Sequence, residues 1–213
     1  MRKAILSGAV ALSTLSATAA SASVTVGGFT FDNNAFVDTL LSSSGSFTVS
    51  GGTLSSVLTD TNVATYAFPS SEGASLTLGF TDNVAVNGAG NDIVLFELGT
   101  PDTWNVLING VTHSYTSSAT GESAGGFSLN AAALDLSDFG IGAGASITSL
   151  RLSFVTSNSG TVASTSLVGA LNSGPVGVPE PATWATMLFG FGGLGAALRR
   201  RRALALTTAP SAA

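Results

Sequence analysis

Residues 104–116 read Trp-Asn-Val-Leu-Ile-Asn-Gly-Val-Thr-His-Ser-Tyr-Thr, and this stretch indicates the fold class. Two β-prone runs, 104–108 and 111–116, flank Asn109-Gly110. Asn-Gly between such runs is a strong hairpin signal, because both residues tolerate a positive φ angle. The sequence therefore predicts two antiparallel strands joined by a tight turn.

Similar patterns extend outward from this hairpin. Residues 75–80 alternate between apolar and small or polar side chains, which predicts a strand with one buried face. Residues 93–98 are apolar on both faces except for Glu97, which predicts a central strand. Residues 147–155 alternate again and place Arg151 on the face opposite the apolar side chains. Further candidate strands, separated by turns rich in Gly, Asn, Asp and Ser, are 24–31, 47–49, 54–58, 64–68 and 161–167.

The region 23–171 shows no amphipathic helix of useful length. Regular short strands with frequent turns predict an all-β body, a β-sandwich and most readily a jelly roll. A right-handed β-helix is the alternative, although no clear short repeat supports it. Residues 172–178, Asn-Ser-Gly-Pro-Val-Gly-Val, are expected to form a linker.

Composition limits the functions available to the body. The chain has 213 residues and no cysteine, so it contains no disulfide and no thiolate metal site. Its basic residues lie almost entirely at the two ends, and residues 23–178 carry Arg151 against eleven acids, a balance of 1 − 11 = −10. Such a body repels phosphate backbones, so nucleic acid is excluded as a partner. The acidity suits divalent cations or simply solubility.

The N-terminal residues 1–22 have the pattern of a secretory signal peptide. Arg2 and Lys3 precede a short apolar run, and Ala20-Ser21-Ala22 offers small residues for cleavage after Ala22, with cleavage after Ala20 as the alternative. An N-terminal signal helix handled by the secretion machinery is therefore expected. The alternative, an uncleaved anchor, needs a longer apolar run.

The C-terminal part has a second sequence pattern that indicates export. Residues 179–181 read Pro-Glu-Pro, an extended segment, and residues 182–198 contain no charge. At about 1.5 Å per residue, 182–198 reaches roughly 25 Å as a helix, which is a marginal transmembrane helix. The arginines 199–202 would stay cytoplasmic and the body would face outward. Residues 203–213 form a bland tail.

This C-terminal pattern closely resembles the PEP-CTERM sorting signal over residues 178–202. The resemblance implies that an exosortase recognises the chain, cuts it near Pro-Glu-Pro after a transient stay in the inner membrane, and leaves the body in the envelope or outside the cell. It also implies a Gram-negative bacterium that makes exopolysaccharide. A plain C-terminal anchor without sorting is the alternative. The sorting residues that match are Pro179, Glu180, Pro181, Trp184, Arg199, Arg200, Arg201 and Arg202.

Part of the body resembles galactose-binding-like (discoidin-like) jelly rolls. The similar segments are 60–66, 73–80 and 87–97, and they imply a binding or adhesive module. In particular Asp60, Asn62 and Thr65 resemble the first loop of the structural calcium site of that fold. Calcium prefers six to eight oxygen ligands. The alternative is that Asp and Asn serve only as turn residues that bind their own backbone. No other cofactor is expected.

Catalytic signals are weak. His113 is the only histidine and falls on a polar strand, and no Gly-x-Ser-x-Gly or His-Glu-x-x-His motif occurs. Paired carboxylates for glycoside hydrolysis remain open, because their pairing is spatial. Trp104, Tyr66 and Tyr115 are either core residues or platforms on which a sugar stacks.

These observations favour a non-enzymatic surface or matrix protein that is sorted by exosortase and associates with exopolysaccharide. A secreted carbohydrate-active enzyme with two carboxylates is the second hypothesis, and a passive envelope filler without a specific ligand is the third.

Overall fold

The computed structural model describes residues 22–71, 73–156, 160–176, 188–189 and 191. The predicted signal helix, nearly all of the predicted transmembrane helix 182–198 and the tail 203–213 lie outside these residues. Within the described part of the chain, no helix is both long and apolar enough to cross a membrane.

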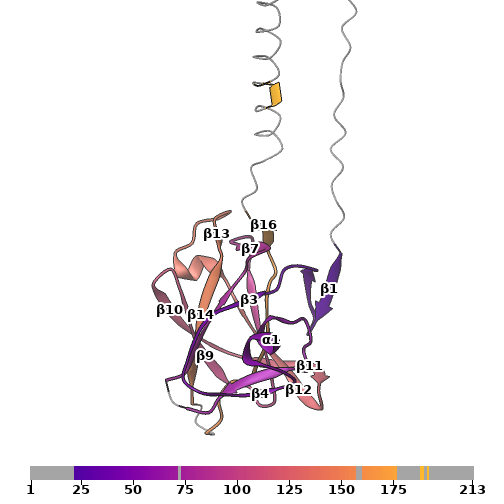
Figure 1. Cartoon of the computed structure of the whole chain (residues 1–213), viewed down its shortest axis with the longest axis vertical. Helices are drawn as coiled ribbons and strands as arrows, with labels where there is room; N and C mark the ends of the chain where they lie inside the picture. Colours follow the sequence, from indigo (N-terminus) through magenta and orange to yellow (C-terminus); the bar gives the residue numbers. More distant parts are fainter. Residues whose placement is uncertain (1–21, 72, 157–159, 177–187, 190, 192–213) are drawn as a thin grey trace, which may run out of the picture.

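Two antiparallel sheets form most of the body (Figure 1). Every strand pairing that the structure describes is antiparallel, so the predicted all-β sandwich is confirmed and the parallel β-helix is wrong. The first sheet consists of β3 (Thr39–Ser44), β6 (Ser75–Gly79), β9 (Thr103–Ile108), β10 (Val111–Thr116) and β14 (Ser149–Val155), in the spatial order β10-β9-β14-β6-β3. The second consists of β4 (Phe47–Ser50), β5 (Tyr66–Pro69), β8 (Ile93–Leu98), β11 (Ser118–Ala124), β12 (Phe127–Leu134) and β15 (Thr165–Ala170), in the order β11-β12-β8-β15-β5-β4.

Smaller elements complete the body. A hairpin of β1 (Ser23–Val26) and β2 (Phe29–Asp32) is separate from a short sheet of β7 (Asn83–Val86), β13 (Ser146–Ile147) and β16 (Ser173–Pro175). Within residues 22–176 the helices that the structure describes are α1 (Leu54–Thr59) and the 3₁₀ turn η1 (Leu136–Phe139). Asp135 caps η1 by accepting a bond from the backbone N–H of Ser137.

The main core fills the space between the two sheets. Trp104 and Val106 of β9 meet Ile93 and Leu95 of β8 there, and all four side chains are buried. A second cluster covers the outer face of the six-stranded sheet, where Phe96 of β8 packs beneath the β1–β2 hairpin. Because β8 is covered on both faces, the predicted central strand at 93–98 is confirmed.

The predicted hairpin at Asn109-Gly110 is also confirmed. β9 and β10 pair directly across it, and both turn residues have positive φ angles, 51° and 78°. Arg151 is exposed, as expected, on the face of β14 opposite Leu150 and Leu152. The strand at 75–80 is covered more fully than the one-sided prediction, because β6 lies between β14 and β3 and its Ser75 and Gly79 are buried as well.

The predicted strand at 54–58 is wrong, since this segment forms helix α1. Thr53 and Ser56 make a reciprocal capping box, in which each side chain accepts a bond from the backbone N–H of the other residue. Val57 and Leu58 are buried one turn inside the helix. The capping box therefore favours a helix here, although the composition of the segment is typical of a strand.

Two predicted boundaries also change. The single strand expected at 24–31 is the β1–β2 hairpin, because Gly27 and Gly28 both adopt positive φ angles and reverse the chain. The linker expected at 172–178 overlaps the body, because residues 173–175 pair with β7 as strand β16.

Candidate functional site

A cleft of about 380 Å³ lies on the outer face of the six-stranded sheet, beside the area that the β1–β2 hairpin covers. The adjacent strands β5, β8 and β12 and the segment that leads into β15 contribute its walls. The described residues that line it are Tyr66, Phe68, Leu98, Gly99, Thr100, Asp102, Phe127, Gly160, Thr161, Val162 and Ser164.

Three aromatic side chains form one side of the cleft. Tyr66 and Phe68 share a face of β5 because side chains alternate along a strand, and their rings lie nearly parallel with centroids 6.3 Å apart. Phe127, at the start of β12, meets Tyr66 edge to face at 5.8 Å. Tyr66 and Phe68 are half-buried, whereas Phe127 is 46% exposed. Apolar surface is thus available to a ligand.

Other residues that line the cleft are polar. Asp102 ends the turn 99–102, which leads from β8 of one sheet to β9 of the other. Its carboxylate accepts a 2.6 Å hydrogen bond from the hydroxyl of Thr161, another lining residue. Thr100 and Ser164 add hydroxyl groups to the same walls. The cleft therefore combines aromatic faces with a few hydrogen-bonding groups, as is typical of small-ligand sites.

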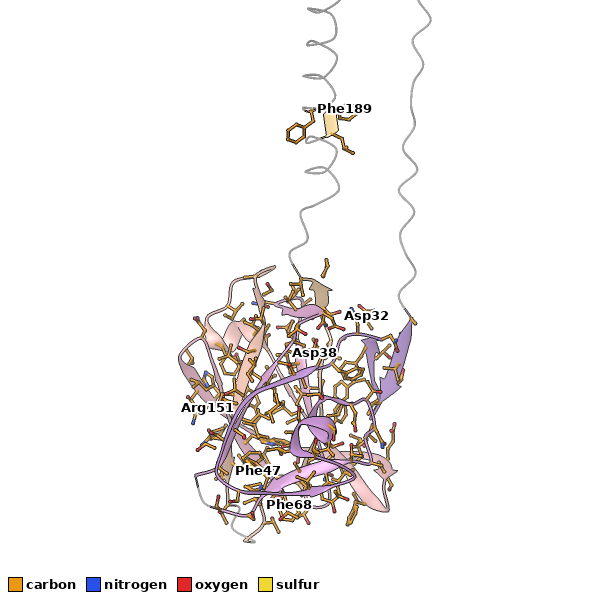
Figure 2. All side chains as sticks on the ribbon, viewed as in Figure 1. Asp32, Asp38, Phe47, Phe68, Arg151 and Phe189 are labelled. Carbon is orange, nitrogen blue, oxygen red and sulfur yellow. The ribbon has the colours of Figure 1, made fainter. Side chains whose placement is uncertain are left out.

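A second hollow of about 530 Å³ adjoins the cleft. The two hollows share Gly160 and Val162 in their walls, and the second extends toward Phe154 of β14. Figure 2 shows Phe68 and Phe47 at the end of the body opposite β16, which Figure 1 places at the top. The concave surface thus lies at the far end from the segment that leads to the sorting motif.

A buried polar cluster lies between the sheets behind the turn 99–102. Glu97 occupies the inward face of β8 and is fully buried. Its Oε1 atom accepts hydrogen bonds from the backbone N–H of Asp102, at 2.7 Å, and from the hydroxyl of Ser117. Nearby, the indole N–H of Trp104 donates to the hydroxyl of Thr165 at 2.9 Å.

The charge of Glu97 is poorly compensated. Burial raises the pKa of its carboxyl to about 7, and the negative charge of Asp102 adds to this effect against the hydrogen bonds from Ser117 and Asp102, which lower it. Such a pKa suits a general acid. Glu97 is closed to solvent, however, and Asp102 is the sole carboxylate among the described residues that line the cleft.

The residues predicted to bind calcium do come together, in the loop after α1. One oxygen of Asp60 accepts a bond from the backbone N–H of Asn62, and the hydroxyl of Thr65 donates to both Asp60 oxygens at 3.1 Å. The side-chain oxygen of Asn62 accepts from the N–H of Ala64. These contacts are those of a self-bonded turn. Calcium binding here stays a prediction, and the described residues include no group of three or more His, Cys, Asp or Glu side chains suited to a metal.

A pair of carboxylates, Asp38 and Asp82, lies near this loop. The Oδ2 atom of Asp38 accepts from the hydroxyl and backbone N–H of Thr81 and from the N–H of Asp82. Burial opposes ionisation of Asp38, but these hydrogen bonds outweigh it and lower its pKa. Burial, together with the neighbouring Asp38 carboxylate, raises the pKa of Asp82. Both line a small hollow of about 170 Å³.

The other predicted aromatic platforms differ from Tyr66. Trp104 is fully buried in the main core. Tyr115 stacks on Phe139, and its hydroxyl donates to Asp138 at 3.2 Å. Burial, followed by the charge of Asp138, raises the pKa of Tyr115 to about 12. His113 is exposed on β10, where its ring meets Phe139 edge to face and its Nε2 atom is 3.1 Å from the Asp138 carbonyl oxygen.

Sequence reasoning missed several residues of the cleft and of the cluster behind it. The alternation of Tyr66 with Phe68 was a local signal for a shared aromatic face. No local signal identified Phe127, Asp102 and Asn130, because strand pairing brings them together. The positions of Phe127 and Asn130 follow from the register of β12 with β8, in which Leu129 faces Leu98, and Asp102 lies in the turn that connects β8 to β9.

The sorting residues Pro179, Glu180, Pro181, Trp184, Arg199, Arg200, Arg201 and Arg202 lie outside the described residues. Of the same segment the structure describes Leu188, Phe189 and Phe191, which are helical and exposed (Figure 2). Residues 177–202 match the family model of the PEP-CTERM protein-sorting motif. The motif implies an exosortase-targeted protein of the cell surface or the exterior. No curated protein and no solved structure is significantly similar to the chain.

Proposed function

We propose that this exosortase-targeted protein is a non-catalytic module that holds exopolysaccharide in the cleft beside Tyr66, Phe68 and Phe127. The observation that carries the proposal is the trio of aromatic rings at one cleft mouth. Sugar rings present an apolar face of C–H groups, which packs on aromatic rings, and an edge of hydroxyl groups. Asp102, which is 4% exposed, and Thr100 and Thr161 also line the cleft and supply a carboxylate and hydroxyl groups for such an edge.

The charge of the cleft favours a neutral glycan. Asp102 accepts hydrogen bonds from sugar hydroxyls, but it repels uronic acids and sulfate groups. The body offers little to offset this repulsion, because Arg151 is its one Lys or Arg residue and lies on the outer face of the other sheet. The adjoining second hollow gives room for more than one sugar unit, which suits a polymer.

A non-catalytic role agrees with the placement of the carboxylates. Glycosidases that use two carboxylic acids place them about 5–10 Å apart on both sides of the scissile bond. Here Glu97 is enclosed between the sheets, on the opposite side of β8 from the aromatic trio. The pair Asp38 and Asp82 lines a separate hollow.

The test measures binding of the purified full-length chain to soluble neutral glucans and galactans, with an acidic uronic polymer in parallel. Phe127→Ala should weaken binding to the retained neutral glycan about tenfold, equivalent to about 1.4 kcal/mol, because a partly exposed ring is lost from the cleft. Tyr66→Ala should weaken it at least as much. The matched control is Leu41→Ala, which truncates a side chain that is 55% exposed on the other sheet.

Three outcomes would contradict the proposal. Equal binding by wild type and Phe127→Ala would place the ligand elsewhere. Retention of no neutral glycan would favour the passive filler. New reducing ends, formed by wild type but not by Asp102→Asn, would favour the carbohydrate-active enzyme, for which the raised pKa of Glu97 is the one supporting observation.

A further inference from the structure

The turn 99–102, which forms the polar wall of the cleft, is held from the interior by two side chains. At one end of the turn, Oε1 of Glu97 accepts a hydrogen bond from the backbone N–H of Asp102, with an N···O distance of 2.7 Å. The amide N–H of Asn130 donates to the carbonyl of Gly99 at the other end, at 3.0 Å. Both supporting side chains are fully buried, so their bonding state bears directly on the position of the turn.

Each of these side chains also has one oxygen without a partner among the described residues. These atoms are Oε2 of Glu97 and Oδ1 of Asn130. Glu97 and Asn130 are directly paired positions of β8 and β12, so their side chains share a face with Cβ atoms about 5 Å apart. Both orphan atoms are acceptors. One proton on Oε2 of Glu97 provides the donor that satisfies both of them.

The surroundings of Glu97 supply no positive charge. β12 contributes Asn130, β15 contributes Thr165 at the paired position, and the segment before β11 contributes Ser117. The backbone N–H of Ser164, just before β15, also lowers the pKa of Glu97. Asp102 is the ionisable group that faces Glu97. The guanidinium of Arg151 donates instead to Ser75 on another strand.

We propose that Glu97 is a neutral carboxylic acid that donates its proton to Asn130, and that this proton, taken from solvent, holds the turn 99–102 in its glycan-binding position. Loss of the proton leaves a buried charge beside Asp102 and two unpaired acceptors behind the turn. Water then reaches these atoms only if the turn opens. Glycan binding is therefore strongest below neutral pH and declines as Glu97 ionises. The part concerning glycan rests on the proposed function, whereas the proton and the turn do not.

The test compares the full-length wild type with Glu97→Gln, which keeps an acceptor for Asp102 and Ser117 and places an N–H group toward Asn130. Glu122→Gln is the control, because Glu122 is an exposed glutamate of β11. In infrared difference spectra at about pH 6, wild type and the control should show a protonated carboxyl band that Glu97→Gln lacks. Absence of that band from the wild type would overturn the proposal.

Amide exchange reports on the turn itself. At about pH 8.5 the amides of Gly99 and Asp102 should exchange about fivefold faster in wild type than in Glu97→Gln, with the two chains equal at about pH 6. Equal exchange at both pH values would overturn the link between the proton and the turn.

The affinity for the retained neutral glycan should fall about fivefold over the same pH range in wild type and in the control, but not in Glu97→Gln. If the infrared and exchange results are as expected but no glycan binds, the protonation of Glu97 and its effect on the turn are supported, and the proposed function is contradicted. If millimolar calcium slows amide exchange in the wild type and a chelator restores it, Oε2 of Glu97 and Oδ1 of Asn130 bind a cation. That result would overturn the proposed protonation of Glu97.

Discussion

The two ends of strand β8 each bury a carboxyl group and treat it differently. Asp92, just before the strand, is fully enclosed, and its oxygens accept from the N–H groups of Gly88 and Leu136 and from the amide of Asn172, at 2.7–2.9 Å. Glu97, near the end of the strand, accepts its two well-formed hydrogen bonds on Oε1, and its Oε2 atom has none of comparable geometry among the described residues. Asp92 therefore joins three segments of the chain, whereas the ionised form of Glu97 is left incompletely bonded.

The carboxylate at one end of β8 therefore holds a single arrangement, whereas the carboxyl group at the other end can respond to pH. The Asp92 end adjoins β16, where the chain continues toward the sorting motif, and the Glu97 end adjoins the cleft. Burial alone does not determine the role of a carboxylate. The number of N–H donors directed at it determines whether it stabilises one arrangement or responds to protons.

The largest effect is expected for Asp92→Ala. The substitution leaves the buried N–H group of Leu136 without an acceptor and also removes the bonds from Gly88 and Asn172, so the free energy of unfolding should fall by about 4 kcal/mol in urea denaturation. Asp135→Ala, which removes the cap of a partly exposed 3₁₀ turn, should cost much less and serves as the comparison. Equal losses in the two variants would show that Asp92 is not a special junction.

The next effect is a pH dependence at the Glu97 end. Folding raises the pKa of Glu97 from its ordinary value of 4.5 to about 7, so the folded protein favours the protonated carboxyl. Its contribution is complete below about pH 4.5 and is lost as the pH rises through about 7, with a total on the order of 3 kcal/mol.

Urea denaturation between about pH 5.5 and 8.5 should therefore show stability that falls with pH, and Glu97→Gln should flatten the curve. The lowered pKa values of Asp38 and Asp135 act in the opposite direction. Their contributions change near and below pH 4, outside this window. Wild-type stability that rises with pH across the window would contradict the assignment.

Asn130→Ala tests the support of the cleft. The variant removes the donor to Gly99 and the partner of Glu97, so unfolding should become easier by about 2 kcal/mol. The loss should be smaller above neutral pH, because ionised Glu97 no longer donates to Asn130 there. A loss below about 0.5 kcal/mol would indicate that the turn 99–102 is held by other contacts.

The smallest effect is expected for Asn172→Ala, the matching asparagine at the other end. Asp92 keeps its two backbone donors, so the loss should be about 1 kcal/mol and independent of pH. Thermal unfolding of Asn130→Ala and Asn172→Ala side by side compares the two ends directly. A larger loss in Asn172→Ala would reverse the expected order of the two ends.

The sequence predicted those parts of the fold that depend on residues close together in the chain. Asn109-Gly110 specified its own turn, and the apolar run 93–98 specified a strand covered on both faces. The segment 54–58 was misjudged because the reciprocal bonds of Thr53 and Ser56 outweigh its strand-like composition. The sorting motif was predicted for the same reason as the hairpin, because its signal is contiguous in the chain.

The candidate site was much less predictable. Tyr66 was identified as a possible platform, but its partner Phe127 is distant in sequence and reaches it through strand pairing. The relation between Glu97 and Asn130 likewise depends on the register of β8 with β12. Knowledge of which strands are neighbours, and of their exact alignment, was needed before these side chains could be placed together.

The position of the cleft opposite β16 has a consequence for many copies of the protein acting together. If copies are held at a surface through the segment that follows β16, the cleft residue Phe68 lies at the end of the body away from that surface (Figure 2). A polymer with repeating units then meets several clefts at once, and each engaged site raises the local concentration of the next unit. Avidity of this kind exceeds the affinity of one site by roughly a hundredfold or more. Weak individual binding would then suffice for durable attachment that still allows the polymer to slide and exchange.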